Sequence, residues 1–314
     1  MKFVPVRNRA WLAYALATVG LFGIWQMLPK LPALAPTDPL AVQLAALPGL
    51  LTALLVTGGI RGIRHAPRGG VLWALFTGLG GALGTLAILH AFALGGEGSL
   101  VTPLCAMYPL VTALGARLVL REKLGAVQKV GFLLFGAAVA AFGAEGASPT
   151  SGPIVAWIPY AALAFLIFGA SGLSMKVATK HGPASAALTG WSMGFVGATL
   201  SLTAVQPADL PPRGPFWVLA FVYGLLMGLG LWTSFEAYRR GKAAVVTAVT
   251  ALYPAVTVVL SVCWPSINES LSAYKALAIA LSLAAGAALA IEPSPSADSD
   301  AQVVDPDRTG GINR

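Results

Sequence analysis

Residues 105–112, CAMYPLVT, place a proline in the middle of a long apolar segment, and residues 250–257, TALYPAVT, do the same further along the chain. Five of the eight positions are identical at an offset of 145 residues: Ala106/Ala251, Tyr108/Tyr253, Pro109/Pro254, Val111/Val256 and Thr112/Thr257. A proline inside a helix leaves the carbonyl four residues earlier without its usual donor. In lipid, such a break is tolerated only beside protein or a water-filled cavity. The repeated phrase therefore predicts two broken membrane helices beside a binding cavity; a packing kink without ligand contact is the alternative.

The composition is that of an integral membrane protein. Hydrophobic residues make up 57% of the chain, charged residues only 10%, and the mean hydropathy is +0.77, whereas soluble domains carry roughly 25% charged residues. The net charge of +8 would suggest nucleic acid in a soluble protein, but the basic residues here gather beside apolar segments. We therefore expect the lipid bilayer as a partner and no nucleic acid.

Neither the cysteines nor the N-terminus indicates a secreted protein. Cys105 and Cys263 fall in different apolar segments, so they form no disulfide framework or metal-binding spacing, and we interpret both as buried free thiols. The apolar run from Trp11 to Leu28 exceeds the roughly 7–15 residues of a signal peptide's apolar region. We interpret it as a retained first helix.

Ten segments have the roughly 20 apolar residues that a membrane-spanning helix needs. Their expected limits are Ala10–Leu28, Leu40–Ile60, Val71–Leu94, Ser99–Leu118, Gly125–Ala144, Pro153–Met175, Pro183–Val205, Phe216–Tyr238, Ala243–Trp264 and Ser272–Ile291. The sequence therefore predicts an all-α integral membrane fold with ten transmembrane helices.

The basic residues predict how these helices are oriented. With a cytoplasmic N-terminus, 17 of the 20 lysines and arginines fall on the cytoplasmic side, and only Lys30, Arg213 and Lys275 fall outside. Cytoplasmic loops are enriched in basic residues, so both termini are predicted to be cytoplasmic. The polar segment after Glu292, with its four aspartates, is predicted to be a disordered cytoplasmic tail.

Further matches at nearly the same offset indicate an internal duplication. They pair Phe22 with Phe168, Gly23 with Gly169, Lys30 with Lys176, Glu122 with Glu269 and Glu145 with Glu292. We divide the chain into a first five-helix repeat, 1–148, a second repeat, 149–292, and a tail, 293–314. Because five is odd, the second repeat enters the membrane from the opposite side. Two inverted repeats are a common transporter architecture.

The last two helices of each half resemble the EamA-type branch of the drug/metabolite transporter superfamily. The first half reads TPLCAMYPLVTALGARLVLREKLGAVQKVGFLLFGAAVAAFG at 102–143, and the second reads TAVTALYPAVTVVLSVCWPSINESLSAYKALAIALSLAAGAALA at 247–290. The chain departs from the family pattern at Gln43, where arginine is frequent, and at WPSINES, 264–270. The resemblance implies a ten-helix exporter or exchanger of small metabolites in a bacterial inner membrane. It implies no enzyme activity and no cofactor, and a monomer or homodimer.

Intramembrane polar groups are the candidates for substrate binding. We expect the following residues to line the site: Trp25, Gln26, His90, Tyr108, Ser171, Ser174, Trp232, Thr233, Glu236, Thr250 and Tyr253, with the helix breaks at Pro109 and Pro254. For two of them a structural role is the alternative: His90 as a packing histidine, and Glu236 paired with Arg239 or Arg240. The glycine pairs Gly80/Gly84, Gly190/Gly194 and Gly224/Gly228 are interpreted as close helix contacts.

The function predicted from these residues is secondary transport of a small neutral or zwitterionic metabolite, amino-acid-like, by alternating access. An unpaired ion at the membrane midplane is costly, and neither Tyr-Pro centre has an acidic or basic residue nearby. A non-transporting membrane scaffold is the alternative. A membrane-embedded enzyme is less favoured because no HExxH motif and no paired intramembrane carboxylates occur.

The orientation can be tested with topology reporters. Reporters that are active only in the cytoplasm should be active when fused after Arg64, Arg121, Lys180 and Arg240. The same reporters should be silent when fused after Glu97, Glu145, Arg213 and Glu269, because an odd number of spans then precedes each fusion. An inverted or mixed pattern would contradict ten helices with cytoplasmic termini.

Overall fold

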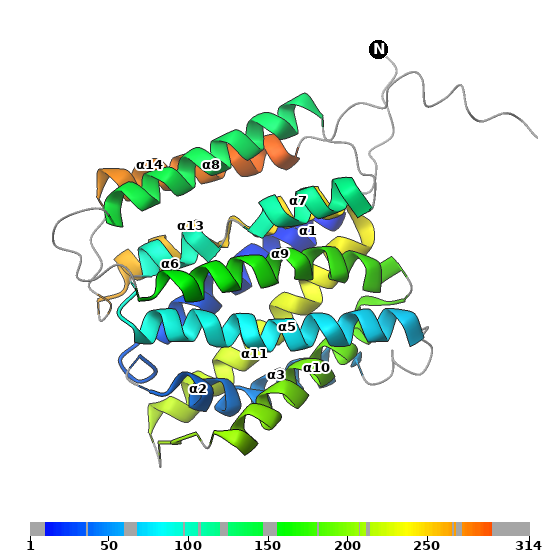
Figure 1. The fold of residues 1–314 in the computed structure, drawn as a ribbon, viewed down its shortest axis with the longest axis vertical. Coiled ribbons are helices and arrows are strands. Elements are labelled where there is room, and N and C mark those ends of the chain that lie inside the picture. Colours follow the sequence, from blue (N-terminus) through cyan, green and yellow to red (C-terminus); the bar gives the residue numbers. More distant parts are fainter. Residues whose placement is uncertain are drawn as a thin grey trace, which may run out of the picture.

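The computed structural model is a bundle of α-helices (Figure 1). It describes residues 10–35, 37–59, 68–96, 98–105, 108–119, 125–146, 156–180, 182–206, 208–211, 214–265, 267 and 272–290. The predicted tail, 293–314, lies outside the described residues.

Thirteen α-helices and one short 3-10 helix are formed by the described residues. In the first half they are α1 (Ala10–Met27), η1 (Leu28–Lys30), α2 (Pro39–Ala45), α3 (Leu47–Val56), α5 (Arg68–Ala93), α6 (Gly98–Cys105), α7 (Tyr108–Val119) and α8 (Ala126–Gly146). In the second half they are α9 (Ile158–Lys180), α10 (Ala184–Val205), α11 (Pro215–Arg240), α12 (Ala243–Thr250), α13 (Tyr253–Cys263) and α14 (Ala273–Ala290).

Seven of the described helical segments are long and apolar enough to cross a membrane. Three of these join consecutive elements: Ala10–Lys30, Pro39–Val56 and Ala243–Cys263. Shorter apolar helices cover Tyr108–Val119, Lys129–Ala138 and Ala276–Ala285. The chain is therefore a polytopic membrane fold, as the sequence predicts.

The outer surface of the bundle is apolar. Large hydrophobic side chains that are more than half exposed occur on most of the helices, among them Leu55, Phe76, Leu118, Leu133 and Val218. A soluble protein rarely exposes so much contiguous apolar surface. In a bilayer these side chains face lipid, while the helices satisfy their own backbone groups.

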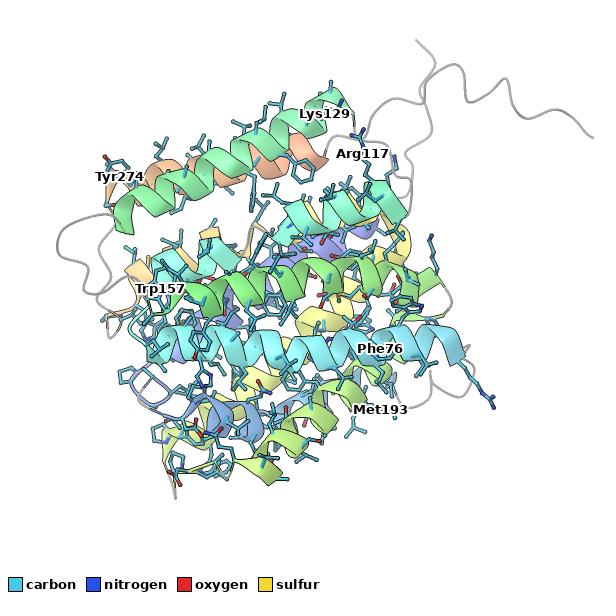
Figure 2. The ribbon with its side chains drawn as sticks, viewed as in Figure 1. Phe76, Arg117, Lys129, Trp157, Met193 and Tyr274 are labelled. Carbon is cyan, nitrogen blue, oxygen red and sulfur yellow. The ribbon has the colours of Figure 1, made fainter. Side chains whose placement is uncertain are left out.

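The helices run from one polar end of the bundle to the other (Figure 2). Arg117 and Lys129 lie at one end, and Trp157 and Tyr274 lie at the opposite end. Since α8 starts near Lys129 and α14 near Tyr274, these two packed helices are antiparallel. We call the end with Arg117 the Lys176 face, because α9 ends there, and the opposite end the Lys30 face.

Both Tyr-Pro phrases coincide with helix interruptions. α12 ends at Thr250 and α13 begins at Tyr253, so that Pro254 stands in the first turn of a new helix. Pro109 has the same position in α7. Proline is well tolerated there because the first N–H groups of a helix have no intrahelical partner. A third break separates α2 from α3, ahead of Pro48, where the sequence analysis expected one continuous helix.

Glycines bring two pairs of helices into backbone contact. A Cβ atom at Gly194 of α10 would overlap the carbonyl oxygen of Leu75 in α5. A Cβ atom at Gly224 of α11 would overlap the carbonyl oxygen of Ala46, which lies between α2 and α3. Each contact is reciprocal, through Gly78 and Gly49 respectively. The two crossings are related by an offset of 145 or 146 residues, and they confirm that these glycines serve packing.

Two equivalent hydrogen bonds join the halves. The Thr112 hydroxyl of α7 donates to the Gly169 carbonyl of α9 at 2.7 Å, and the Thr257 hydroxyl of α13 donates to the Gly23 carbonyl of α1 at 3.0 Å. Each half-helix that follows a Tyr-Pro break is thus attached to the first helix of the other half. Buried interhelical hydrogen bonds of this kind stabilise membrane bundles.

The cysteines are free, and one of the two expectations about their burial is wrong. Cys105 is buried, as expected, but Cys263 is exposed. Cys263 is the last residue of α13, where the helix leaves the packed interior and Trp264 is also exposed. Its apolar neighbours in the sequence therefore reflect the lipid-facing surface.

The glycine crossings give a stability prediction. Gly194→Ala and Gly224→Ala should each destabilise the bundle by about 1–3 kcal/mol, because the added methyl group meets backbone atoms that cannot move aside. Gly197→Ala is the matched control: it lies in α10 with no atom within 4 Å of the added Cβ, and alanine favours helix over glycine. Thermal unfolding of the purified variants in detergent measures this. Equal midpoints for Gly194→Ala and Gly197→Ala would contradict the close crossing.

Candidate functional site

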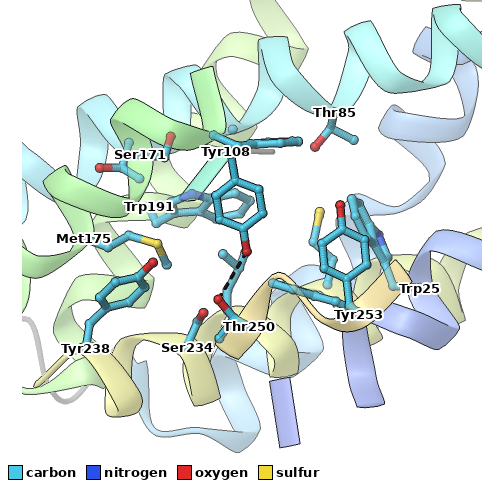
Figure 3. Close-up of a pocket in the computed structure, with 17 residues that line it drawn as sticks. Trp25, Thr85, Tyr108, Ser171, Met175, Trp191, Ser234, Tyr238, Thr250 and Tyr253 are labelled. Carbon is cyan, nitrogen blue, oxygen red and sulfur yellow. Dashed lines mark hydrogen bonds between the residues drawn. The ribbon is translucent and has the colours of Figure 1, made fainter. Parts of the chain in front are cut away.

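A cavity lies between the two halves of the bundle, next to the Tyr-Pro breaks (Figure 3). It contains about 710 Å³ of space free of protein atoms, part of which is open to solvent. Its lining is Phe22, Trp25, Thr77, Gly81, Thr85, Tyr108, Phe168, Ser171, Gly172, Met175, Trp191, Met227, Leu231, Ser234, Tyr238, Thr250 and Tyr253.

The helix breaks supply the centre of this lining. Tyr108 begins α7, Thr250 ends α12 and Tyr253 begins α13. The Tyr108 and Thr250 hydroxyls are 3.2 Å apart (Figure 3), and the Thr250 hydroxyl donates to the Thr247 carbonyl at 3.0 Å. Tyr108 is therefore the donor to Thr250, and this bond joins the two halves across the cavity.

The lining is mostly apolar and carries no charged side chain, but several hydroxyl groups belong to it. It carries the hydroxyls of Thr77, Thr85, Tyr108, Ser171, Ser234, Tyr238, Thr250 and Tyr253. Seven of the 17 lining residues are aromatic, and none is an aspartate, glutamate, lysine, arginine or histidine. Such a surface offers hydrogen bonds to a neutral or zwitterionic solute and aromatic faces to a cation. Within the described residues, no three His, Cys, Asp or Glu side chains gather as metal ligands would.

The structure brings together five of the residues that the sequence analysis nominated. Trp25, Tyr108, Ser171, Thr250 and Tyr253 line the cavity. Pro109 and Pro254 are the residues that follow the two tyrosines in the sequence, at the starts of α7 and α13. These seven positions come from both Tyr-Pro phrases and from the first helix of each half.

The six other nominated residues, Gln26, His90, Ser174, Trp232, Thr233 and Glu236, lie outside this lining. The two ionisable ones have local partners. His90 Nδ1 is 3.0 Å from the Leu86 carbonyl oxygen, and its ring stacks on Tyr160. The Glu236 carboxylate pairs with Arg239 and Arg240, at 2.8 Å each. These contacts agree with the structural role that was the alternative for both side chains.

Thr233 and Trp232 of α11 and Ser174 of α9 also have packing partners. The Thr233 hydroxyl bonds the Thr18 hydroxyl of α1 at 2.8 Å, and Trp232 packs edge-on against Tyr14. The Ser174 hydroxyl donates to the Ala170 carbonyl of its own helix. A residue on a helix that borders the cavity thus need not line the cavity, since only one side of each helix faces it.

Several lining residues were missed, and the repeat contained the signal for some of them. At the offset of 146, Ser171 corresponds to Trp25 and Phe168 to Phe22, so one member of each pair predicts the other. Thr85 and Leu231 form another such pair, whereas Trp191 gave no such signal. Trp191 stands beside Gly190 in the α5–α10 crossing, and its indole ring meets Gly81. The absence of a side chain at Gly81 leaves room for that ring at the cavity wall.

Comparison with known proteins agrees with the resemblance found in the sequence. Residues 155–291 match the EamA-like transporter family, so the second half carries a domain of this family and the chain is a multi-pass membrane protein. Among the solved structures, 28 chains match. One, a crystal structure of a protein that is 17% identical, has a TM-score of 0.68, and the match covers 90% of this chain and 97% of that chain. That likeness shows the fold alone. No curated protein matches the chain.

The tyrosine hydroxyls can be tested one at a time. Tyr108→Phe removes the bond to Thr250 without changing the shape of the ring, and a neutral hydrogen bond contributes about 1 kcal/mol. We expect Tyr108→Phe and Tyr253→Phe to weaken apparent substrate affinity about fivefold at normal expression. Tyr160→Phe, outside the cavity against His90, is the control. If both cavity variants transport like the unmodified protein, the Tyr-Pro phrases serve packing alone.

Proposed function

We propose that this protein is a secondary transporter that exports or exchanges a small neutral or zwitterionic metabolite, amino-acid-like, by alternating access. The observation that carries the proposal is the uncharged, hydroxyl-rich and aromatic cavity at two helix breaks, lined by both halves of the chain. Discontinuous helices at corresponding positions of two repeats are typical of transporter binding sites.

The lining argues against strongly charged substrates. A phosphate ester brings a dianion into the bundle, and burying unpaired charge costs several kcal/mol per ion. No basic side chain lines the described cavity to compensate that cost. A net-neutral zwitterion avoids it, because its ammonium can lie against aromatic faces and its carboxylate can accept hydrogen bonds from the tyrosine, serine and threonine hydroxyls.

The proposal includes ten spans arranged as two inverted five-helix repeats, 1–148 and 149–292. In support, the glycine crossings and the threonine bonds recur at one offset, and α8 and α14 run in opposite directions. The distribution of basic residues supports a cytoplasmic Lys176 face and an inner-membrane protein with both termini inside. Transport is then outward, from the Lys176 face to the Lys30 face.

No proton-coupling group lines the cavity among the described residues. Glu236 and His90, the deepest ionisable side chains of the sequence, are held by local partners. We therefore propose facilitated export or exchange. A scaffold without transport has no use for hydroxyls around an uncharged cavity, which favours the transporter over that alternative.

Reconstituted protein tests this function directly. Purified protein in liposomes should exchange labelled neutral amino acids or related neutral solutes and ignore phosphorylated sugars, because only the former cross without a counter-charge. Liposomes without protein, and protein with Tyr108→Phe and Tyr253→Phe combined, are the controls. Robust exchange of a phosphate ester without flux of any neutral or zwitterionic solute would show that the cavity has been misinterpreted.

A further inference from the structure

Two equivalent lysines hold different helices. Lys176 Nζ donates to the carbonyl oxygens of Tyr238, at 2.8 Å, and of Gly241, in and just after the last turn of α11. Its counterpart in the repeat, Lys30, donates to the Ser261 hydroxyl of α13 at 2.7 Å. At the offset of 146, Tyr238 and Gly241 correspond to Phe92 and Gly95, at the end of α5.

Helix packing shows the same asymmetry. On the Lys176 face, α9 packs against α11. The corresponding helices on the Lys30 face are α1, with η1 at its end, and α5. Their contact is largely restricted to the short element η1. A small hollow is lined there by Pro29 of η1 and by Phe92 and Ala93 of α5. The bundle is therefore closed on the Lys176 face and more open on the Lys30 face.

Buried hydroxyls mark the same difference. On the Lys176 face the Tyr238 and Thr247 hydroxyls are bonded at 2.6 Å. The counterpart of Thr247 on the other face is Thr102, which is fully buried yet has no hydrogen-bond partner among the described residues. The counterpart of Tyr238 is Phe92, which has no hydroxyl to offer. Thr102 thus lacks in this conformation the bond that Thr247 makes.

Gln26 has the position to supply that missing bond. It corresponds to Gly172, where a Cβ atom would lie 3.1 Å from the Tyr238 hydroxyl. The Gln26 carboxamide is fully buried and lies next to Tyr253. Neither its oxygen nor its nitrogen has a hydrogen-bond partner within 3.5 Å among the described residues. When the Lys30 face packs as the Lys176 face does here, Gln26 occupies the space of the Tyr238 hydroxyl, next to Thr102.

We propose that Lys30 and Lys176 are alternating gate residues, each binding the C-terminal end of a cavity helix when its own face of the membrane closes. In the conformation described, Lys176 closes its face by holding α11. When the other face closes, Lys30 leaves Ser261 and binds the carbonyl oxygens of Phe92 and Gly95, Gln26 bonds Thr102, and Lys176 releases α11. The proposal rests on the alternating-access function proposed above.

The chemistry suits a reversible contact. The last carbonyls of a helix carry partial negative charge and have no intrahelical donor, so a lysine ammonium binds them well. In this structure the end of α5 uses backbone donors instead: the N–H groups of Gly95 and Gly96 bond the Phe92 and Ala91 carbonyls. Each lysine contact exists in one conformation only, and it therefore shifts the balance between the two.

Distances between spin labels on each face can test the proposal. In a background with Cys105→Ala and Cys263→Ala, one pair of labels is placed at Pro32→Cys and Leu94→Cys, and the other at Lys180→Cys and Lys242→Cys, all exposed positions. In the full-length protein in liposomes, the two distances should vary in opposite directions as the faces open and close.

The gate variants should move these populations in opposite directions. Lys176→Met should increase the fraction open on the Lys176 face by roughly tenfold, because the charged hydrogen bonds to the end of α11 are lost from one state. Lys30→Met should increase the fraction open on the Lys30 face by less, because it loses the bond to Ser261 in one state and those to two helix-end carbonyls in the other. Ser261→Ala removes one partner of Lys30 in the described conformation and should favour closure of the Lys30 face. Lys30→Arg, which keeps charge and donors, should stay within about twofold of the unmodified ratio.

Three outcomes would overturn the gate. They are unchanged distances in Lys176→Met, unchanged distances in Lys30→Met, or shifts of the same sign in Lys30→Met and Ser261→Ala. A failure of the substrate assignment is distinguishable, because the unmodified protein would then show no flux of neutral solutes while its label distances still responded as expected. Gln26→Leu gives a second reading: it should favour the conformation open on the Lys30 face, and Thr102→Val should do the same.

Discussion

The hydrogen-bonding demand of the backbone in lipid governs this structure. A helix that crosses a bilayer satisfies its own N–H and C=O groups, and each proline placed within it removes one donor. The chain meets that demand by ending one helix and beginning another, so that Pro109 and Pro254 stand in first turns, where no donor is needed. Side chains at the breaks then face inward. Tyr108, Thr250 and Tyr253 reach the cavity for this reason.

Close helix contacts determine how the cavity is formed, and in lipid the hydrophobic effect does not drive these contacts. Lipid tails are as apolar as leucine, so close contact has to come from small residues and buried hydrogen bonds. Gly194 and Gly224 bring α10 onto α5 and α11 onto the α2–α3 segment, and the Thr112 and Thr257 hydroxyls bond the first helix of the opposite half. The same kinds of contact therefore occur in both halves, as the proposed alternating access requires.

The charges of the bundle are placed at its ends. Glu236 pairs with Arg239 and Arg240, and Lys176 donates to helix-end carbonyls, while the described cavity lining holds no charged side chain. This separation keeps the cost of buried charge low where the substrate would lie. It also puts the strongest polar contacts at the two faces, where they can stabilise one open or closed arrangement over another.

The sequence determined the membrane class, the two helix breaks at the Tyr-Pro phrases and the resemblance to EamA-type transporters, because composition, apolar length and a duplicated Tyr-Pro phrase are local properties. It also nominated Trp25, Tyr108, Ser171, Thr250 and Tyr253, which the structure places around one cavity. Only the tertiary structure decided which side of each helix faces inward. Gln26, Thr233 and Glu236 are a residue or a turn away from that side, and helices that are apolar all round give no periodic signal for it. The asymmetry of Lys30 and Lys176 was likewise invisible in the chain, since the repeat makes them equivalent and only packing distinguishes the closed face from the open one.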